Sequence, residues 1–375
     1  MKATYQWALG VAAVSVLAMG CGGDDDEGAE KKQIERVEVA DSDFKPTELE
    51  ATIDDLVEAL TETEADSFEM TVVTKPFGGY WEPVKVGANR AMAELELTGQ
   101  VEAPTDEDDP DVTTEAQIEI VKNRREEGYG GLGIAPMRES LAEEMDAFVA
   151  AGAPVVTIDS DLPESDRHLY IGTNNGEAGR SAGETLLNLL TEDSGTVIIL
   201  GYPDEDWPDG YARSMGASEV LEAAGYDVIV HRVGWSEDEV ATDMEVLPGM
   251  VESADPPVVG MLGMFSNAYR CAEIVEGLGY EPGEVKIAAF DFEPDTLSYM
   301  ESGYIQATHV QRQYYMGYLV PYAIYSIRVL GLDATVDLLQ DQMIDDERLD
   351  TGVDVVEADQ VDEYNDFLDT LGIGG

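Results

Sequence analysis

The sequence predicts an α/β protein made of two similar lobes, each organised around a parallel sheet. Two observations carry this prediction. From Phe68 onward, short β-branched segments alternate with amphipathic segments of helical period, and a second alternation of the same kind begins after His168–Gly172. The chain has 375 residues, 44% of them hydrophobic, which is enough for two domains of ordinary size. Repeated strand–helix units favour parallel strands joined by right-handed crossovers.

The first alternation is anchored by Val155–Asp161, where four β-branched residues run directly into two carboxylates. An apolar run of this kind is typical of a parallel strand that is buried on both faces. Earlier strands are expected at 68–74, around Val101 and at 131–134. Helices are expected at 113–127, at 140–151 and along the apolar face formed by Val84, Ala88, Ala91, Met92 and Leu95.

The second alternation contains further strands and the helices between them. Strands are expected at 196–201, 227–232, 258–262, 285–290 and 305–310. Helices are expected at 176–190, 211–224, 237–252, 267–278 and 313–330, and an acidic helix at 359–371 closes the chain. Ligand sites in open α/β sheets lie at the carboxyl ends of the strands, so the residues that follow these strands are the candidates for a site.

The N-terminal residues predict export. Lys2 precedes an apolar segment, Trp7–Met19, which is too short for a comfortable membrane span and is typical of a signal peptide at 1–20. Leu17–Cys21 resembles a bacterial lipobox, with Ala18 in place of a larger aliphatic residue, and implies acyl chains on Cys21. An ordinary secretory signal is the alternative. Residues 21–67 combine an acidic tether with an amphipathic helix, whose apolar face is formed by Leu49, Ile53, Leu56, Val57 and Leu60.

Charge and motif spacing narrow the classes of partner. The chain carries 79 acidic and 21 basic residues, a net charge of −58, which argues against nucleic acid and disfavours anionic ligands. The three histidines lack the spacing of a metal site, so no metal is expected. No cofactor is expected either, because the G-x-G-x-x-G motif at Gly128–Gly133 lies between a helix and a strand, the reverse of the dinucleotide-binding order.

A cell-surface hydrolase is an alternative that the residues leave open. Gly179–Gly183 matches G-x-S-x-G, and His231 and His309 lie downstream of it. A nucleophile elbow, however, places its serine on a sharp turn between a strand and a helix. Ser181 falls inside the helix expected at 176–190, and its small neighbours fit close packing of that helix.

Polar and aromatic residues recur where the predicted strands end. Carboxylates and amides form paired hydrogen bonds with vicinal hydroxyl groups, and aromatic rings cover the apolar face of a sugar-like ring. In a concave site, such a set suits a small neutral ligand. The residues are Tyr80, Trp81, Asp159, Asp161, Trp207, Asp209, Tyr211, Arg213, Trp235, Ser266, Asn267, Asp291 and Gln311.

Four motifs give these residues a family context: Pro154–Pro163, Arg167–Gly179, Ala289–Asp291 and Gln311–Tyr318. From Phe68 to about Glu357 the chain resembles type I periplasmic sugar-binding proteins, the ribose-binding-like cluster that feeds ABC transporters. The resemblance implies two Rossmann-like lobes joined by a three-crossover hinge near Thr173, Gln311–Arg312 and Thr351–Gly352. It assigns 68–172 and 312–351 to the N-terminal lobe, and 173–311 and 352–375 to the C-terminal lobe.

The same resemblance implies ligand-binding roles for strand-end residues. Tyr80 and Trp81 correspond to the aromatic clamp of the first lobe. Asp159 and Asp291 correspond to the sugar-binding carboxylates of the two lobes. Gln311 corresponds to the amide at the hinge.

Further correspondences are less direct. Trp235 matches the ring-facing aromatic residue of the second lobe, and Asn267 matches the asparagine after Leu262 once a small gap is allowed. The arginine at the head of the next helix is Arg213, or Tyr211 takes its place in a shifted alignment. Asp161 either contacts the ligand or pairs with Arg167 beside the first hinge segment.

The chain departs from the family pattern where Gly78 replaces an asparagine, Ala135 a polar residue and Ser160 an arginine, so ribose itself is not implied. The resemblance implies a non-enzymatic, lipid-anchored solute-binding protein of the periplasm or cell envelope. It would act as a monomer that captures a monosaccharide or sugar-like ligand and delivers it to the permease of an ABC-type importer. A ligand-presenting sensor for chemotaxis or signalling is the alternative.

Overall fold

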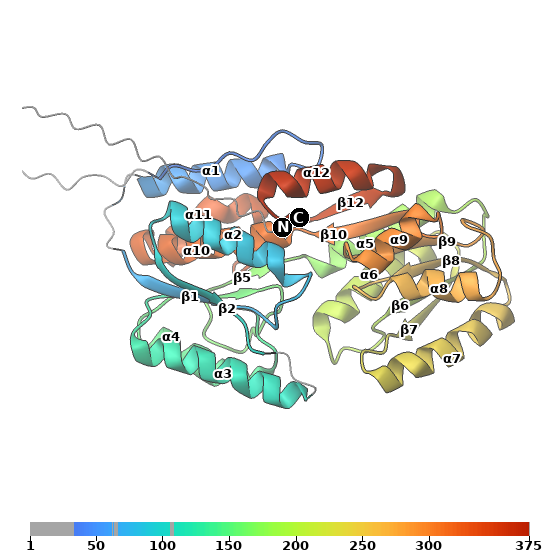
Figure 1. The fold of residues 1–375 in the computed structure, drawn as a ribbon, viewed down its shortest axis with the longest axis horizontal. Helices are drawn as coiled ribbons and strands as arrows, with labels where there is room; N and C mark the ends of the chain where they lie inside the picture. Colours follow the sequence, from blue (N-terminus) through green and yellow to red (C-terminus); the bar gives the residue numbers. More distant parts are fainter. Residues whose placement is uncertain (1–33, 62, 64–66, 106–108, 375) are drawn as a thin grey trace, which may run out of the picture.

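The computed structural model describes residues 34–61, 63, 67–105 and 109–374. Two sheets of six strands each organise this part of the chain (Figure 1). The predicted signal peptide at 1–20 and Cys21 lie outside the described residues. Within the described ranges, no helix combines the length and apolar character needed to cross a membrane.

The first sheet consists of parallel strands only. Its strands are β1 (Glu69–Val73), β2 (Thr98–Glu102), β3 (Leu132–Ile134), β4 (Val155–Ile158), β5 (Leu169–Gly172) and β11 (Arg348–Asp350). They lie in the order β11-β5-β4-β3-β1-β2. Its connecting helices are α2 (Trp81–Glu94), α3 (Pro110–Glu127) and α4 (Ala142–Ala150), the last preceded by a 3-10 turn at Glu139–Leu141. Every residue of β4 is buried, as predicted for a strand covered on both faces.

The second sheet repeats this arrangement. Its strands are β6 (Thr196–Gly201), β7 (Asp227–Arg232), β8 (Val258–Gly263), β9 (Lys286–Phe290), β10 (Ala307–Gln311) and β12 (Val353–Glu357). Their order, β12-β10-β9-β8-β6-β7, matches that of the first sheet strand for strand, although β12 runs antiparallel to β10. The helices are α5 (Asn175–Leu189), α6 (Pro208–Ala223), α7 (Glu237–Ser253), α8 (Tyr269–Gly277) and α9 (Pro294–Glu301). The prediction of two similar α/β lobes is therefore confirmed.

Helices from distant parts of the sequence complete the first lobe. In Figure 1, α2 and α10 (Gln313–Leu330) lie on one side of the first sheet, and α3 and α4 lie on the other. The predicted amphipathic helix is α1 (Thr47–Thr61), which packs on α10 and on α11 (Leu332–Leu339). A 3-10 turn at Gln340–Gln342 follows α11. The chain ends with a 3-10 turn at Ala358–Gln360 and helix α12 (Val361–Leu371), which contacts β12.

The chain passes between the two sheets three times, as predicted: from β5 to α5, from β10 to α10 and from β11 to β12. Hydrogen bonds join these crossovers. Thr173 Oγ1 donates to Gln311 Oε1 (2.9 Å), and Arg312 Nη1 donates to the carbonyl oxygen of Thr351 (3.0 Å). The backbone N–H of Thr351 donates to the carbonyl oxygen of Gly172 (2.7 Å). These three hydrogen-bonded crossover segments, which we call the crossover bundle, connect the two lobes.

Candidate binding cleft

A cleft of about 690 Å³ lies between the carboxyl ends of the two sheets. Residues that follow β1 and β4 line it from the first lobe, and the start of α5 and residues that follow β6, β7, β8 and β9 line it from the second. This is the edge at which open α/β sheets bind ligands. The predicted residues that line the cleft are Tyr80, Trp81, Asp159, Arg213, Trp235, Asn267, Asp291 and Gln311.

Asp159 and Asp291 occupy equivalent positions, directly after β4 and β9. Both have left-handed backbone angles, with φ of 62° and 65°. Each N–H is tied to the neighbouring strand: Asp159 donates to the carbonyl oxygen of Ile171 (3.0 Å) and Asp291 to that of His309 (2.8 Å). A left-handed conformation is uncommon outside glycine and tends to occur at functional sites. Its repetition in both lobes marks these two carboxylates as a matched pair at the cleft.

The wall of the first lobe is aromatic and polar. The rings of Tyr80 and Trp81 meet edge to face, with centroids 5.0 Å apart. The hydroxyl group of Tyr80 donates a hydrogen bond to Asp159 Oδ1. Lys75 Nζ lies 4.0 Å from Asp159 Oδ2. The clamp tyrosine is thus held to the carboxylate beside it.

The wall of the second lobe is an aromatic cluster. The rings of Trp207 and Phe265 stack with centroids 4.9 Å apart, and Trp235 packs against Phe265 at 5.6 Å. Trp235 Nε1 donates to the hydroxyl oxygen of Tyr202 (3.1 Å), which fixes the indole. Because Trp235 remains 46% exposed, its ring has free surface at this wall. Aromatic surfaces therefore stand on both sides of the cleft.

Arg213 is a buried cation held by polar and aromatic groups. Its Nε and Nη2 donate to Asn175 Oδ1 at 2.9 and 2.6 Å. The guanidinium also lies over the rings of Phe265 and Phe290, at 5.3 and 4.6 Å from their centroids. No carboxylate in the described part of the chain lies within ion-pair distance of Arg213. Its charge therefore acts on the cleft without being neutralised by a bonded acid.

Two amide side chains complete the polar set. Gln311 Nε2 donates to Asp291 Oδ1 (3.4 Å), while its Oε1 accepts from Thr173 at the crossover bundle. Asn267 is buried, and neither its amide oxygen nor its amide nitrogen has a hydrogen-bond partner within the described ranges. Buried polar groups are normally hydrogen-bonded, so Asn267 is a strong candidate for a ligand contact.

Burial shapes the protonation of the cleft. It raises the pKa of Asp291 to about 6, although Arg213 and Gln311 act in the opposite direction. Burial also raises the pKa of Asp209. For Tyr80, burial is again the main cause, and the Asp159 and Asp291 carboxylates raise its pKa further. At neutral pH the cleft therefore presents a protonated tyrosine and carboxylates that lack full solvation.

Comparison with known proteins agrees with this geometry. Residues 69–329 match the family described as periplasmic binding protein domain. The chain belongs to that family. The predicted type I two-lobed architecture is thereby confirmed. No curated protein matches the chain.

Solved structures share the fold of this periplasmic binding protein. A sugar ABC transporter (sugar-binding protein) from Bacillus halodurans is 24% identical, with a TM-score of 0.66 over 79% of this chain and 99% of that chain. An ABC transporter solute-binding protein from Burkholderia graminis C4D1M, in complex with D-arabinose, is 27% identical, with a TM-score of 0.61 over 79% and 97%. A periplasmic ribose ABC transporter from Conexibacter woesei DSM 14684 is 15% identical, with a TM-score of 0.68 over 81% and 96%.

Two predicted site residues of this periplasmic binding protein do not line the cleft. Asp161 accepts hydrogen bonds from Arg167 Nε (2.5 Å) and Nη2 (2.8 Å) and from Thr157 Oγ1 (2.8 Å). Of its two predicted roles, it therefore has the pairing with Arg167. Tyr211 lies in the first turns of α6, which begins at Pro208, and does not line the cleft. Positions two residues apart lie about 200° apart around a helix, so when Arg213 faces the cleft Tyr211 faces away.

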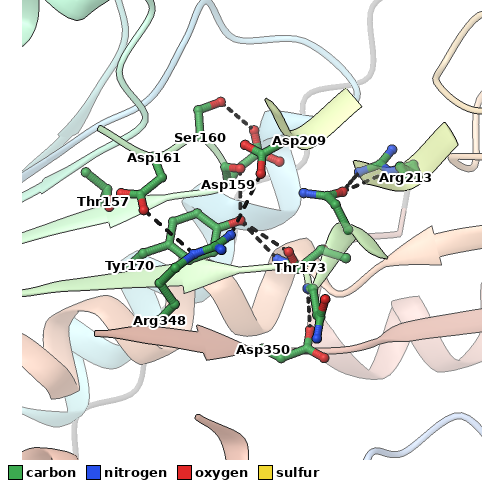
Figure 2. A network of polar contacts seen from close by, with 12 residues as sticks. Thr157, Asp159, Ser160, Asp161, Tyr170, Thr173, Asp209, Arg213, Arg348 and Asp350 are labelled. Carbon is green, nitrogen blue, oxygen red and sulfur yellow. Dashed lines mark hydrogen bonds and ion pairs between the residues drawn. The ribbon is translucent and has the colours of Figure 1, made fainter. Parts of the chain in front are cut away.

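Several cleft residues had no binding role assigned from the sequence: Lys75, Asn175, Phe265, Arg270 and Glu293, together with Trp207 and Asp209, which belonged only to the wider set of strand-end residues. Trp207 and Asp209 could have been predicted as binding residues, because both follow the strand expected at 196–201. Asp209 also links the lobes, since its Oδ1 lies 3.8 Å from Arg348 Nη2. Figure 2 shows Arg348 between Asp209 and Asp161. The remaining residues of this list reach the cleft through contacts between segments that are distant in the sequence, so no local pattern predicts them.

The motifs weighed for other chemistries have structural roles in this periplasmic binding protein. Ser181 lies inside α5, away from any strand-to-helix turn, as predicted. His231 Nε2 lies 2.8 Å from Asp243, whereas the buried His309 lies 3.1 Å from Thr185 and bonds the backbone of Ser181, so the two histidines have separate partners. Gly128 ends α3 in a left-handed conformation. The described ranges contain no cluster of residues suited to a metal ion.

Proposed function

We propose that this protein is a solute-binding lipoprotein that captures a neutral monosaccharide between its lobes and delivers it to an ABC-type importer. The observation that carries the proposal is the matched pair Asp159 and Asp291, set at equivalent strand ends on the two sides of one cleft. Carboxylates accept hydrogen bonds from adjacent hydroxyl groups of a sugar. The proposed ligand therefore contacts both lobes at once.

The walls support a sugar over other small ligands. Tyr80 and Trp81 on one side and Trp235 on the other present aromatic surface to the apolar face of a pyranose or furanose ring. The amide groups of Asn267 and Gln311 supply donors and acceptors for further hydroxyl groups. The complex of the Burkholderia graminis relative with D-arabinose is consistent with this class of ligand.

A ligand that contacts both lobes at once requires the two lobes to close around it. Binding energy that is available only when both walls touch the sugar would favour the closed arrangement. The crossover bundle near Thr173, Gln311 and Thr351 is the proposed hinge. We further propose that Cys21 carries the lipid anchor, that the protein acts as a monomer in the periplasm or cell envelope, and that the closed form docks on the permease.

A thermal-shift panel tests the binding proposal. Ligands that bind only the native state raise its melting temperature. D-ribose, D-arabinose, D-xylose, D-glucose and D-galactose are compared with their phosphorylated or carboxylated forms, and product formation is assayed in parallel. We expect at least one neutral sugar to raise the melting temperature, no anionic sugar to do so, and no turnover. A shift by anionic sugars alone, or turnover of a bound sugar, would contradict the proposal.

Uptake measurements separate an importer component from a sensor. Cells that lack the protein should lose uptake of the radiolabelled panel sugar that binds, and the full chain should restore that uptake. Restoration should fail with Cys21→Ser if the proposed anchor is needed for delivery. Unchanged uptake together with a lost behavioural response to that sugar would favour the sensor.

A further inference from the structure

Lys75 brings a cation to the first-lobe wall of the cleft. Its Nζ donates to Ser160 Oγ (2.6 Å), and Ser160 Oγ donates to Asp159 Oδ2 (3.2 Å). Figure 2 shows the Ser160–Asp159 half of this chain of contacts. Nζ also lies 4.0 Å from Asp159 Oδ2 and 5.9 Å from the centroid of the Trp81 ring. The ammonium is therefore held beside the carboxylate both directly and through the serine hydroxyl.

Neither of the other two cations that line the cleft forms an ion pair with Asp159 within the described ranges. The guanidinium of Arg213 is bonded to Asn175 and to the carbonyl oxygen of Met264. Arg270 Nη1 donates to the carbonyl oxygen of Gly234 (2.7 Å) and lies 3.6 Å from Asp243, while its Nε has no hydrogen-bond partner within the described ranges. Five acids line the cleft: Asp159, Asp209, Asp291, Glu293 and Asp295. Lys75 is thus the cation of the cleft that offsets the acid of the first lobe.

Lys75 has hydrogen-bonding capacity left for a ligand. An ammonium has three N–H donors, and within the described ranges that of Lys75 makes one hydrogen bond, to Ser160. The side chain is 30% exposed, so it remains accessible from the cleft. A charged donor at this position can bind a ring or hydroxyl oxygen of a sugar whose other hydroxyl groups are bound by Asp159.

Resting on the proposed function, we propose that Lys75 determines the charge of the ligand that the cleft accepts. It offsets Asp159 and binds an oxygen atom of a neutral sugar, so a cationic amino sugar meets repulsion at this wall. Removal of the ammonium would leave Asp159 without its counter-charge. The cleft would then bind neutral sugars less well and amino sugars relatively better.

Calorimetry with Lys75→Met, Lys75→Arg and Lys85→Met tests this assignment. Lys85 is a matched control, because it pairs with Glu82 (3.1 Å), lies 4.9 Å from the centroid of the Phe77 ring and does not line the cleft. The probes are D-ribose, D-arabinose, D-xylose, D-glucose and D-galactose, with D-glucosamine and D-galactosamine as cationic counterparts. Melting temperatures of the unliganded variants establish that each is folded.

We expect Lys75→Met to weaken the best-bound neutral sugar by about tenfold or more, because a charged hydrogen bond is lost. In the same variant, the ratio of the affinity for the neutral sugar to the affinity for the amino sugar should decrease. Lys75→Arg should keep the wild-type ratio, and Lys85→Met should match the wild type. Wild-type affinity and preference in Lys75→Met would overturn the assignment of Lys75 alone. A wild-type protein that binds none of the neutral sugars would overturn the proposed function and this inference with it.

Discussion

At the scale of single residues, the two cleft aspartates share a backbone geometry but differ in their surroundings. Asp159 has Lys75, Tyr80 and Ser160 around its carboxylate. Asp291 is buried, and within the described ranges its carboxylate accepts only the long hydrogen bond from Gln311. The pKa of Asp291, raised to about 6 by burial, reflects this difference. Burial therefore disfavours the ionised form of Asp291 before a sugar arrives.

Asp291→Asn should stabilise the unliganded protein while abolishing sugar binding. The pKa of Asp291 is about 6 in the folded chain against an ordinary 3.8, so its ionisation opposes folding at neutral pH by up to roughly 3 kcal/mol. Because the folded value is the higher one, this residue makes stability fall as pH rises from about 4 to about 6. Urea unfolding of both proteins at pH 7 measures the gain. Asp346→Asn, which removes an exposed acid, is the control, and equal stability of all three proteins would contradict the prediction.

Sugar affinity should depend on pH through the same residue. Hydroxyl groups that donate to Asp291 favour its ionised form, so binding lowers the pKa of this carboxyl below about 6. Affinity for the best neutral sugar should be constant above pH 7 and should fall by up to about tenfold per pH unit below pH 6. Calorimetry between pH 5 and pH 8 measures this. A flat profile would show that the sugar does not use the ionised carboxylate.

At the scale of elements, glycines set how closely paired helices approach each other. A Cβ atom on Gly317 of α10 would lie 1.9 Å from the backbone oxygen of Val84 in α2. The second lobe repeats this device: a Cβ atom on Gly179 of α5 would lie 1.9 Å from the backbone oxygen of Arg213 in α6. In the second lobe the close approach also positions Arg213, so helix packing and the cleft are connected.

Gly317→Ala should lower the free energy of unfolding by about 1–3 kcal/mol or more. The added methyl group would clash with the backbone of α2, which cannot move aside as a flexible side chain would. Gly249→Ala is a matched helical control. Gly249 lies in α7, and a Cβ atom added there would meet nothing within 4 Å, so alanine should be neutral or add up to about 1 kcal/mol of stability. Denaturant unfolding compares them. Similar stabilities for the two variants would show that the helix contact is not tight.

The sequence predicts the elements whose patterns are long or strongly buried. The fully buried β4 and the 18-residue α10 are cases in which hydrophobic patterning alone identifies the element. By contrast, β11 has three residues and α9 has eight, too few for a periodic pattern, and β11 exists through pairing with β5. These elements were missed for that reason.

The site residues that were predicted likewise follow clear sequence patterns, and those that were missed do not. Asp159 and Asp291 were predicted because they directly follow apolar strands that are visible in the sequence. Lys75 was missed because its partner Ser160 lies 85 residues away and no local pattern indicates the contact. Tyr211 was included because a shifted alignment puts it in place of Arg213, and the two residues lie on different faces of α6.

At the scale of the whole molecule, net charge opposes compactness. The chain carries a net charge of −58, and self-repulsion of like charges destabilises the folded state. Salt screens such repulsion, with a Debye length of about 10 Å at 0.1 M. The melting temperature should therefore rise when NaCl increases from low concentration to 1 M. Sucrose at matched osmolality is the control, and a melting temperature independent of NaCl would contradict the prediction.

The account centres on one sugar held by carboxylates from both lobes. Its most direct test is calorimetric titration of the wild type, Asp159→Ala and Asp291→Ala with the neutral sugar that gives the largest thermal shift. The account predicts one-to-one binding to the wild type and loss of the binding heat in both variants, while the unliganded variants remain folded. Wild-type affinity in either variant would contradict the two-lobed clamp.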